Sequence, residues 1–259
     1  MNEENLIKYY NKFNEDKRLN SRHGQVEFIT SMKYIHKYLN NLNNPTILDV
    51  GAGCGRYSIT LALEGYDVTA IELVKHNLRV IESKCKKVKA YQGNAMDLSR
   101  FQDDSFDMVL LFGPMYHLIK DSDKIKALNE AKRVVKKNGF IMVAYCMNEY
   151  CVITHGFKDN NIIDCIDNKL LDSEYHCLSK DTDLYSVVRI EDINRLNNVC
   201  DLRRIQIISP DGPANYLRGV LNKMDENTFN KFLEYHFSTC ERQDLIGAAA
   251  HTLDILRKE

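Results

Sequence analysis

The sequence predicts an α/β protein: a doubly wound, Rossmann-like sheet of seven strands, mostly parallel with an antiparallel last strand, plus N-terminal helices and helical insertions. From about residue 45, short β-branched runs alternate with longer segments of helical periodicity, which is typical of parallel strands joined by crossover helices. The first run ends in a glycine-rich turn, LDVGAGCG (48–55), that opens directly into a helix. The chain has 259 residues, 44% of them hydrophobic and 27% charged, which is enough to build a large core.

The predicted strands are 46–50, 67–72, 88–91, 106–111, 139–147, 202–209 and 249–256. The predicted helices between them are 56–64, 74–86, 122–137 and 190–198. In the third helix, apolar residues recur on one side up to Val135, and Gly139 just beyond is a stop signal.

We predict a single domain over 1–259, in which 45–147 form the cofactor-binding core. Residues 1–44 read as a helical lid, with Leu6, Tyr9, Tyr10 and Phe13 on one amphipathic face. Segments 148–186 and 214–246 do not continue the alternation of strands and helices, so we predict that they are insertions. Both follow strands at the same edge of the sheet, so we expect them to select the substrate.

Charge and cysteine content restrict the class of protein. Lys plus Arg (35) nearly balances Asp plus Glu (36), so no overall field attracts nucleic acid. No run approaches the roughly 18 apolar residues of a membrane span, and the charged start is unlike a secretory signal, which predicts a cytoplasmic protein. The eight cysteines form no CxxC pair. Cys151 and His155 could share a helical face as metal ligands, but such residues usually just pack, and we predict no metal site.

The glycine turn indicates a cofactor. Gly51, Ala52 and Gly53 let a ligand lie against bare main chain. The spacing is GxGxG rather than the GxGxxG of dinucleotide folds, and Asp49 stands two residues before it. A carboxylate there would repel a pyrophosphate but suits an ammonium group, which favours S-adenosyl-L-methionine over NAD.

Two further strand ends extend this site. Glu72 ends the second strand, where an acid can accept both ribose hydroxyls; the alternative is a helix cap. After the third strand, Gly93-Asn94-Ala95-Met96-Asp97 offers a polar side chain and a backbone N–H to an adenine, with Leu73 or Met96 as the apolar neighbour. The alternative there is a polar turn with Asp97 as a helix cap.

Together, DVGAGCG, Glu72, GNAMDL, FDMVLLFGPMYHL and KKNGFIMVAY resemble a class I S-adenosylmethionine-dependent methyltransferase over about 46–147. The Gly-Pro-x-Tyr-His-Leu loop resembles that of small bacterial methyltransferases. The resemblance implies that Asp49, Gly51, Gly53, Glu72 and the Asn94–Ala95 pair contact the cofactor. The family usually has Asp at the position of Asn94, but an amide oxygen can also accept from an adenine amino group.

The segment after the fourth strand should face the reactive methyl group, because ligands of open α/β sheets bind outside the carboxyl ends of the strands. Phe112 would line this site. His117 is the candidate general base, because its ordinary pKa of about 6.5 is close to neutral pH; an orienting role is the alternative. Tyr116 is predicted to donate a hydrogen bond or line the pocket. Tyr10 and Arg22 of the N-terminal helices are predicted to close over the cofactor.

These features predict an enzyme that transfers a methyl group to a small molecule by in-line displacement. Alternatives are an RNA methyltransferase, an oxidoreductase, or a non-catalytic S-adenosylmethionine-binding partner subunit. The basic run KCKKVK (84–89) lacks interleaved aromatic residues for base stacking, and no Asn/Asp-Pro-Pro-aromatic motif of N6-adenine chemistry follows strand four. The acceptor and the oligomeric state stay open.

Overall fold

The structure, a computed structural model, describes residues 6–7, 21–40 and 42–259. Its centre is one sheet with the strand order β3-β2-β1-β4-β5-β8-β7, in which every pairing of β1 to β5 is parallel. β8 is antiparallel to both of its neighbours. The predicted Rossmann-like α/β fold is therefore confirmed, and the antiparallel last strand lies inside the sheet, between β5 and β7.

Most strands begin and end within a few residues of the predicted bounds. They are β1 (Thr46–Val50), β2 (Asp67–Glu72), β3 (Lys89–Gln92), β4 (Phe106–Leu111), β5 (Val135–Met147), β6 (Val187–Val188), β7 (Arg203–Ile208) and β8 (His251–Arg257). β6 was not predicted; it is an eighth, two-residue strand that pairs with the end of β5 at Cys146 and Met147.

One predicted boundary is wrong. Helix 122–137 is too long, because α7 (Asp121–Val134) ends at Val134 and β5 begins at once. Val135 pairs with Phe106, the register then shifts, and Phe140 pairs with Met108. Gly139 lies in this irregularity, where a Cβ would stand 2.9 Å from the carbonyl oxygen of Asp107. Gly139 is therefore needed at the strand irregularity, and it does not mark the end of the helix.

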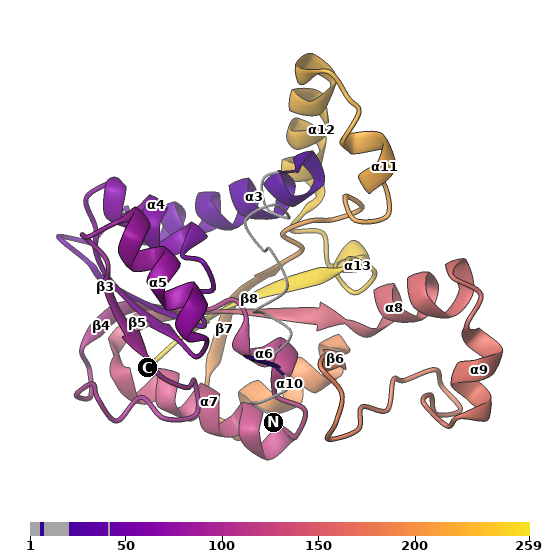
Figure 1. Cartoon of the computed structure of the whole chain (residues 1–259), viewed down its shortest axis with the longest axis horizontal. Coiled ribbons are helices and arrows are strands. Elements are labelled where there is room, and N and C mark those ends of the chain that lie inside the picture. The colour runs from indigo at the N-terminus through magenta and orange to yellow at the C-terminus, as the bar shows by residue number, and fades with distance from the viewer. Residues whose placement is uncertain (1–5, 8–20, 41) are drawn as a thin grey trace.

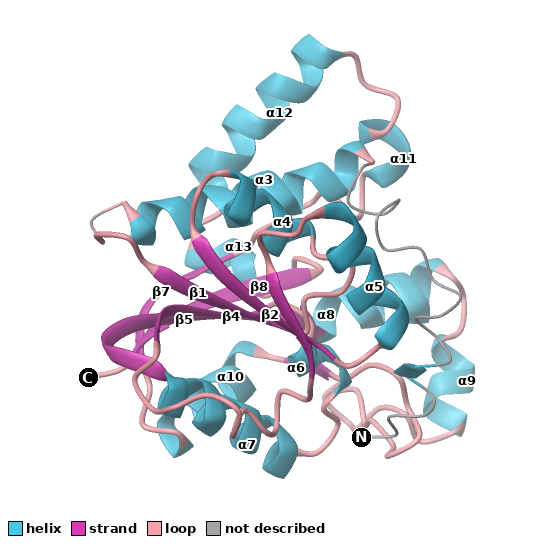
Figure 2. Cartoon of the chain, turned by 60° about the vertical axis from the view of Figure 1, so that its left-hand side comes forward, coloured by secondary structure: helices cyan, strands magenta, loops and turns pink. Residues whose placement is uncertain are grey.

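Helices cover both faces of the sheet (Figures 1 and 2). One face carries α3 (Arg22–Leu39), α4 (Arg56–Leu63) and α5 (Lys75–Lys84), which share an apolar core with strand residues such as Ile47 and Met108. The other face carries α7 and α10 (Ile190–Val199), whose core includes Leu128, Ile193 and Val109. None of the helices in the described part of the chain is both long and apolar enough to cross a membrane.

The first predicted insertion is partly helical and the second is mainly helical. The first holds α8 (Asn148–Cys151), a π-helix at Val152–Lys158 and α9 (Ile162–Asp167). The second holds α11 (Arg218–Leu221), α12 (Glu226–Thr239) and α13 (Gln243–Ile246). Both α11 and α12 contact α3, and Figure 1 shows α11 and α12 rising beside it. The segment predicted as a lid and the second insertion are thus adjacent in space.

Candidate active site

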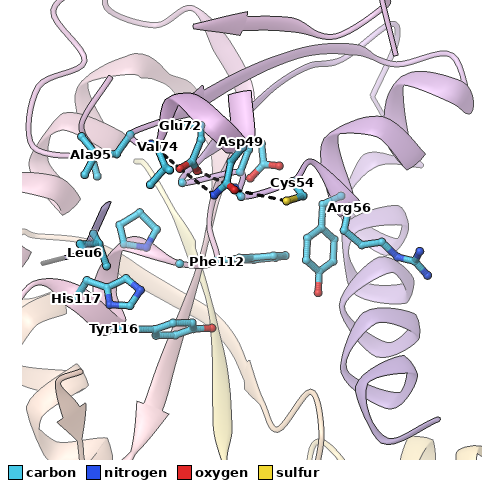
Figure 3. A pocket seen from close by; sticks show the side chains of 18 of the residues that line it. Leu6, Asp49, Cys54, Arg56, Glu72, Val74, Ala95, Phe112, Tyr116 and His117 are labelled. Carbon is cyan, nitrogen blue, oxygen red and sulfur yellow. Dashed lines mark hydrogen bonds between the residues drawn. The ribbon is translucent and has the colours of Figure 1, made fainter. Parts of the chain in front are cut away.

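A cavity of about 340 Å³ opens at the carboxyl ends of β1 to β5. The turns after β1, β2, β3 and β4 supply most of its wall, and Cys146 of β5 and His251 of β8 supply more. Eleven of the predicted site residues line it: Asp49, Gly51, Ala52, Gly53, Glu72, Leu73, Asn94, Ala95, Phe112, Tyr116 and His117. In Figure 3, Asp49 and Glu72 lie on one side of the cavity, and Tyr116 and His117 lie across it.

The glycine turn has the left-handed backbone that its sequence predicts. The φ angles are 74° at Gly51, 54° at Gly53 and 82° at Gly55, values that only glycine adopts without strain. Two backbone N–H groups, of Gly51 and Ala52, donate to the carbonyl of Ile71 in β2. A Cβ on Gly51 would stand 2.7 Å from Cδ of Pro114. The turn after β1 and the loop after β4 therefore touch through a glycine that admits no side chain.

Glu72 connects the first two turns. Its carboxylate is buried and accepts hydrogen bonds from the backbone N–H of Gly53 (2.8 Å) and of Val74 (2.8 Å). Asn77 Nδ2 also donates to Glu72 Oε1, at 3.4 Å, so three donors fix the side chain. The alternative, a helix cap, is not seen, because the N-cap residue of α5 is Val74 and no side chain makes a capping hydrogen bond there.

Asp49 is buried at the end of β1 and accepts a hydrogen bond from the Ser58 hydroxyl. Burial raises the pKa of Asp49 to about 6, although the Ser58 hydrogen bond opposes the shift. This carboxyl group therefore titrates near neutral pH at the wall of the cavity.

The turn after β3 is the polar turn that the sequence left as an alternative. Asn94 Oδ1 accepts from the backbone N–H of Met96 at 2.9 Å, and Asp97 Oδ1 accepts from that of Ser99 at 3.1 Å. Asn94 and Ala95 still line the cavity, but Met96 is not among the lining residues and packs against the apolar core. Met96 is thus a core side chain rather than a wall of this cavity.

His117 is buried and its Nδ1 lies 2.8 Å from the carbonyl oxygen of Leu184. A carbonyl only accepts, so Nδ1 carries the proton and Nε2 carries the lone pair in the neutral ring. Burial lowers the pKa of His117, and the bond to Leu184 partly opposes this. The imidazole is therefore neutral at neutral pH. Its ring contacts the rings of Tyr116 and Tyr185.

Of the two predicted contacts from the N-terminal segment, Arg22 does not line this cavity. Tyr10 lies outside the described residues. Arg22 points away: its guanidinium donates to the carbonyl of Asp225 (3.2 Å) and lies over the ring of Phe229 (5.3 Å). The segment contributes instead Leu6, labelled in Figure 3, and Glu27.

Cys151 ends α8, and His155 lies in the π-helix that follows. The Cys151 thiol hydrogen-bonds with Cys177 and the His155 carbonyl accepts from Asn161. Sequence reasoning named no role for Asp211, Asn215 or His251, although the Asp-Gly-Pro turn at 211–213 was visible. Asn215 and His251 line the cavity, and Asp211 holds both of them.

Comparison with known proteins identifies the family of the core of the chain. Residues 48–143 match the family model of a methyltransferase domain. The chain is 31% identical over 103 residues to a glycine/sarcosine N-methyltransferase of Parasynechococcus marenigrum, covering 38% of this chain and 36% of that protein. It is 27% identical over 130 residues to a ubiquinone biosynthesis O-methyltransferase of Hydrogenovibrio crunogenus, covering 49% and 50%. The chain thus matches half or less of the length of these curated relatives.

Solved structures match over more of the chain. A protein of Pyrococcus horikoshii has a TM-score of 0.60 at 14% identity, covering 97% of this chain and 99% of that one. An S-adenosylmethionine-dependent methyltransferase of Methanosarcina mazei has a TM-score of 0.58 at 18% identity, covering 87% and 96%. Fold, site and family model agree: the chain contains a class I S-adenosylmethionine-dependent methyltransferase domain. S-adenosylmethionine is the cofactor of this class, as the sequence predicted.

Proposed function

We propose that this protein transfers the methyl group of S-adenosylmethionine to a small-molecule acceptor inside the cavity. One observation carries the proposal: a single cavity of about 340 Å³ has the glycine turn and two buried carboxylates on one side and a neutral histidine on the other. This size is at the lower end of ordinary small-molecule sites. Leu6 and Glu27 at its wall favour a compact acceptor over a macromolecule.

The residues fit the cofactor at each of its parts. The Asp49 carboxylate suits the ammonium group, and the bare turn at Gly51 and Gly53 admits the aminoacyl chain. Glu72 is held by two backbone donors in a position to accept from ribose hydroxyls. Asn94 and Ala95 lie where an adenine would be read. When bound, the cofactor supplies a methyl group on a positively charged sulfur.

The chain's own contribution to the reaction is orientation and proton handling. In-line displacement depends on holding acceptor and donor at near-attack distance, which a rigid, largely buried wall provides. His117 Nε2 holds the lone pair needed to accept a proton from the acceptor, because Nδ1–H is committed to Leu184. Tyr116 packs against both His117 and His251, so it orients the wall opposite the cofactor.

The test is isothermal titration calorimetry with S-adenosylhomocysteine and NAD, followed by methyl transfer from labelled S-adenosylmethionine to a panel of small amines, phenols and thiols. We expect micromolar binding of S-adenosylhomocysteine, no binding of NAD, and turnover of at least one small acceptor. A folded protein that ignores S-adenosylhomocysteine at millimolar concentration would contradict the proposal. So would submicromolar RNA binding that weakens steeply with salt together with methylation of RNA alone.

A further inference from the structure

Three side chains from distant parts of the chain meet beside the cavity, and two of them line it. Glu27 comes from α3, Asp211 follows β7, and His251 begins β8. One nitrogen or oxygen atom of each lies within 4.8 Å of the others. The carboxylates are almost fully buried, at 8% and 0% exposure. We call these three residues the acidic triad.

Within the acidic triad, Asp211 acts on its neighbours rather than on the cavity. It does not line the cavity. Its Oδ2 accepts from His251 Nδ1 and from Asn215 Nδ2, both at 2.7 Å, and its Oδ1 accepts from the His251 backbone N–H at 3.2 Å. Asp211 therefore fixes the two side chains that face the cavity, and its charge is matched to that of the His251 ring.

Glu27 is the second carboxylate of the triad, and it lines the cavity. Its Oε2 lies 3.8 Å from His251 Nδ1, beyond hydrogen-bond distance. Burial alone would lower the pKa of His251, but the Glu27 and Asp211 carboxylates raise it well above its ordinary value. Two buried carboxylates therefore flank one histidine ring beside the cavity.

The rest of the cavity wall also favours a cation. No lysine is among the described residues that line it. Arg56 also lines the cavity. Its guanidinium carbon lies 4.3 Å from the centroid of the Phe28 ring, so it makes a cation–π contact there. Aromatic side chains, Tyr116 and Tyr185 among them, face the same space, and aromatic faces attract ammonium groups.

We propose that the acidic triad binds the nitrogen group of the acceptor, so that the substrate class is a small amine. This rests on the proposed function. The Glu27 carboxylate holds the acceptor as an ammonium ion, and the nitrogen gives a proton to His117 Nε2 before it reacts. The nitrogen lone pair then forms the new N–C bond while the C–S bond breaks, its electron pair leaves with sulfur as a neutral thioether, and the methylated nitrogen carries the positive charge.

The test compares amines with oxygen and sulfur acceptors of similar size. Benzylamine, histamine and sarcosine are offered against catechol, 4-hydroxybenzoate and thiophenol, with labelled S-adenosylmethionine. We expect methylation of at least one amine and no oxygen or sulfur product. Glu27→Gln should lower kcat/KM for that amine at least tenfold, mainly through KM, with S-adenosylhomocysteine affinity within twofold of wild type. Glu27→Asp should restore part of the loss.

The matched control is Glu234→Gln on α12, where the carboxylate is exposed and paired with Lys231, and it should change nothing. Equal thermal midpoints of the two variants show that Glu27→Gln folds. Turnover of oxygen or sulfur acceptors only, no turnover of any amine by protein that binds S-adenosylhomocysteine, or an amine rate unchanged by Glu27→Gln would each overturn the proposal. Micromolar Mn²⁺ binding that Glu27→Gln abolishes would make the triad a metal site instead. Failure of S-adenosylhomocysteine itself to bind would refute the proposed function, which is a different result.

Discussion

At the scale of single residues, Asp49 links cofactor binding to pH. Its carboxyl has a pKa of about 6 because burial disfavours the charged form. Below that pH the group is neutral and attracts an ammonium weakly; above it the carboxylate attracts it fully. We therefore expect S-adenosylhomocysteine affinity to rise as pH increases from about 5 to 7. Calorimetry across this range should show the rise in wild type and a weak, flat profile in Asp49→Asn; an identical pH profile in both proteins would contradict the assignment.

His117 carries the second residue-scale prediction. Burial lowers its pKa, so the neutral ring is present throughout the neutral range and is lost only as pH falls below the ordinary histidine value. If it accepts the proton, His117→Gln should reduce kcat by about 10²–10⁴-fold and remove the acid limb of the pH–rate profile. A purely orienting histidine would instead give a smaller loss with the acid limb retained. Circular dichroism and S-adenosylhomocysteine affinity serve as controls for folding.

The site residues could be predicted from the sequence where they lie near the end of a predicted strand. Asp49 and Glu72 lie in the last two residues of their strands, and Asn94 and His117 follow strands, so predicting the strands was enough to bring all four to one edge of the sheet. The acidic triad could not be found that way, because Glu27 and His251 stand more than 200 positions apart and meet only through packing. Arg22 was misread for the same reason: its partners, Asp225 and Phe229, belong to an insertion whose position the sequence does not specify.

At the scale of elements, the contact between the β1 turn and the β4 loop depends on Gly51. Gly51→Ala combines a φ of 74° with a Cβ 2.7 Å from Pro114 Cδ. Left-handed backbone costs a non-glycine residue about 1–3 kcal/mol. The clash should add to that cost and displace the turn from the cofactor. We expect a lower free energy of unfolding in urea and at least a tenfold loss of S-adenosylhomocysteine affinity.

Gly65→Ala separates the two contributions. Gly65 has a φ of 104°, and nothing lies within 4 Å of an added Cβ. It should therefore lose stability through backbone strain alone and keep full cofactor affinity. Equal losses of affinity in the two variants would show that global destabilisation, rather than the turn, weakens binding.

Element boundaries were less predictable where backbone geometry is irregular. The helical periodicity of 122–137 gave no sign that residues 135–137 belong to a strand, because that assignment is set by the pairing of β5 with Phe106 and Met108. The π-helix after Cys151 is likewise invisible to a pattern that assumes 3.6 residues per turn. Such local departures leave the layer order intact and move individual side chains.

At the scale of the whole molecule, the topology followed from periodicity and connection rules, but the position of the last strand did not. β8 pairs with β5 and with β7. Its buried Asp254 side chain also accepts hydrogen bonds from Arg204 and Asn197. The sheet edge that carries the cavity therefore combines residues from position 6 to position 251. A site assembled from both ends of the chain is the physical reason to expect a single cooperative unit, as the sequence predicted.

Scanning calorimetry tests whether the chain unfolds as a single cooperative unit. Ligand at 100 times its Kd stabilises a native state by about 2.7 kcal/mol. For a chain of this size each kcal/mol raises Tm by roughly 2–4 °C, so saturating S-adenosylhomocysteine should raise Tm by roughly 5–10 °C. If 1–259 form one domain, one transition is expected, with equal calorimetric and van't Hoff enthalpies, and all of it should shift. A second transition that stays in place when ligand is added would mean that part of the chain, such as the α11–α12 insertion, folds independently of the cofactor core.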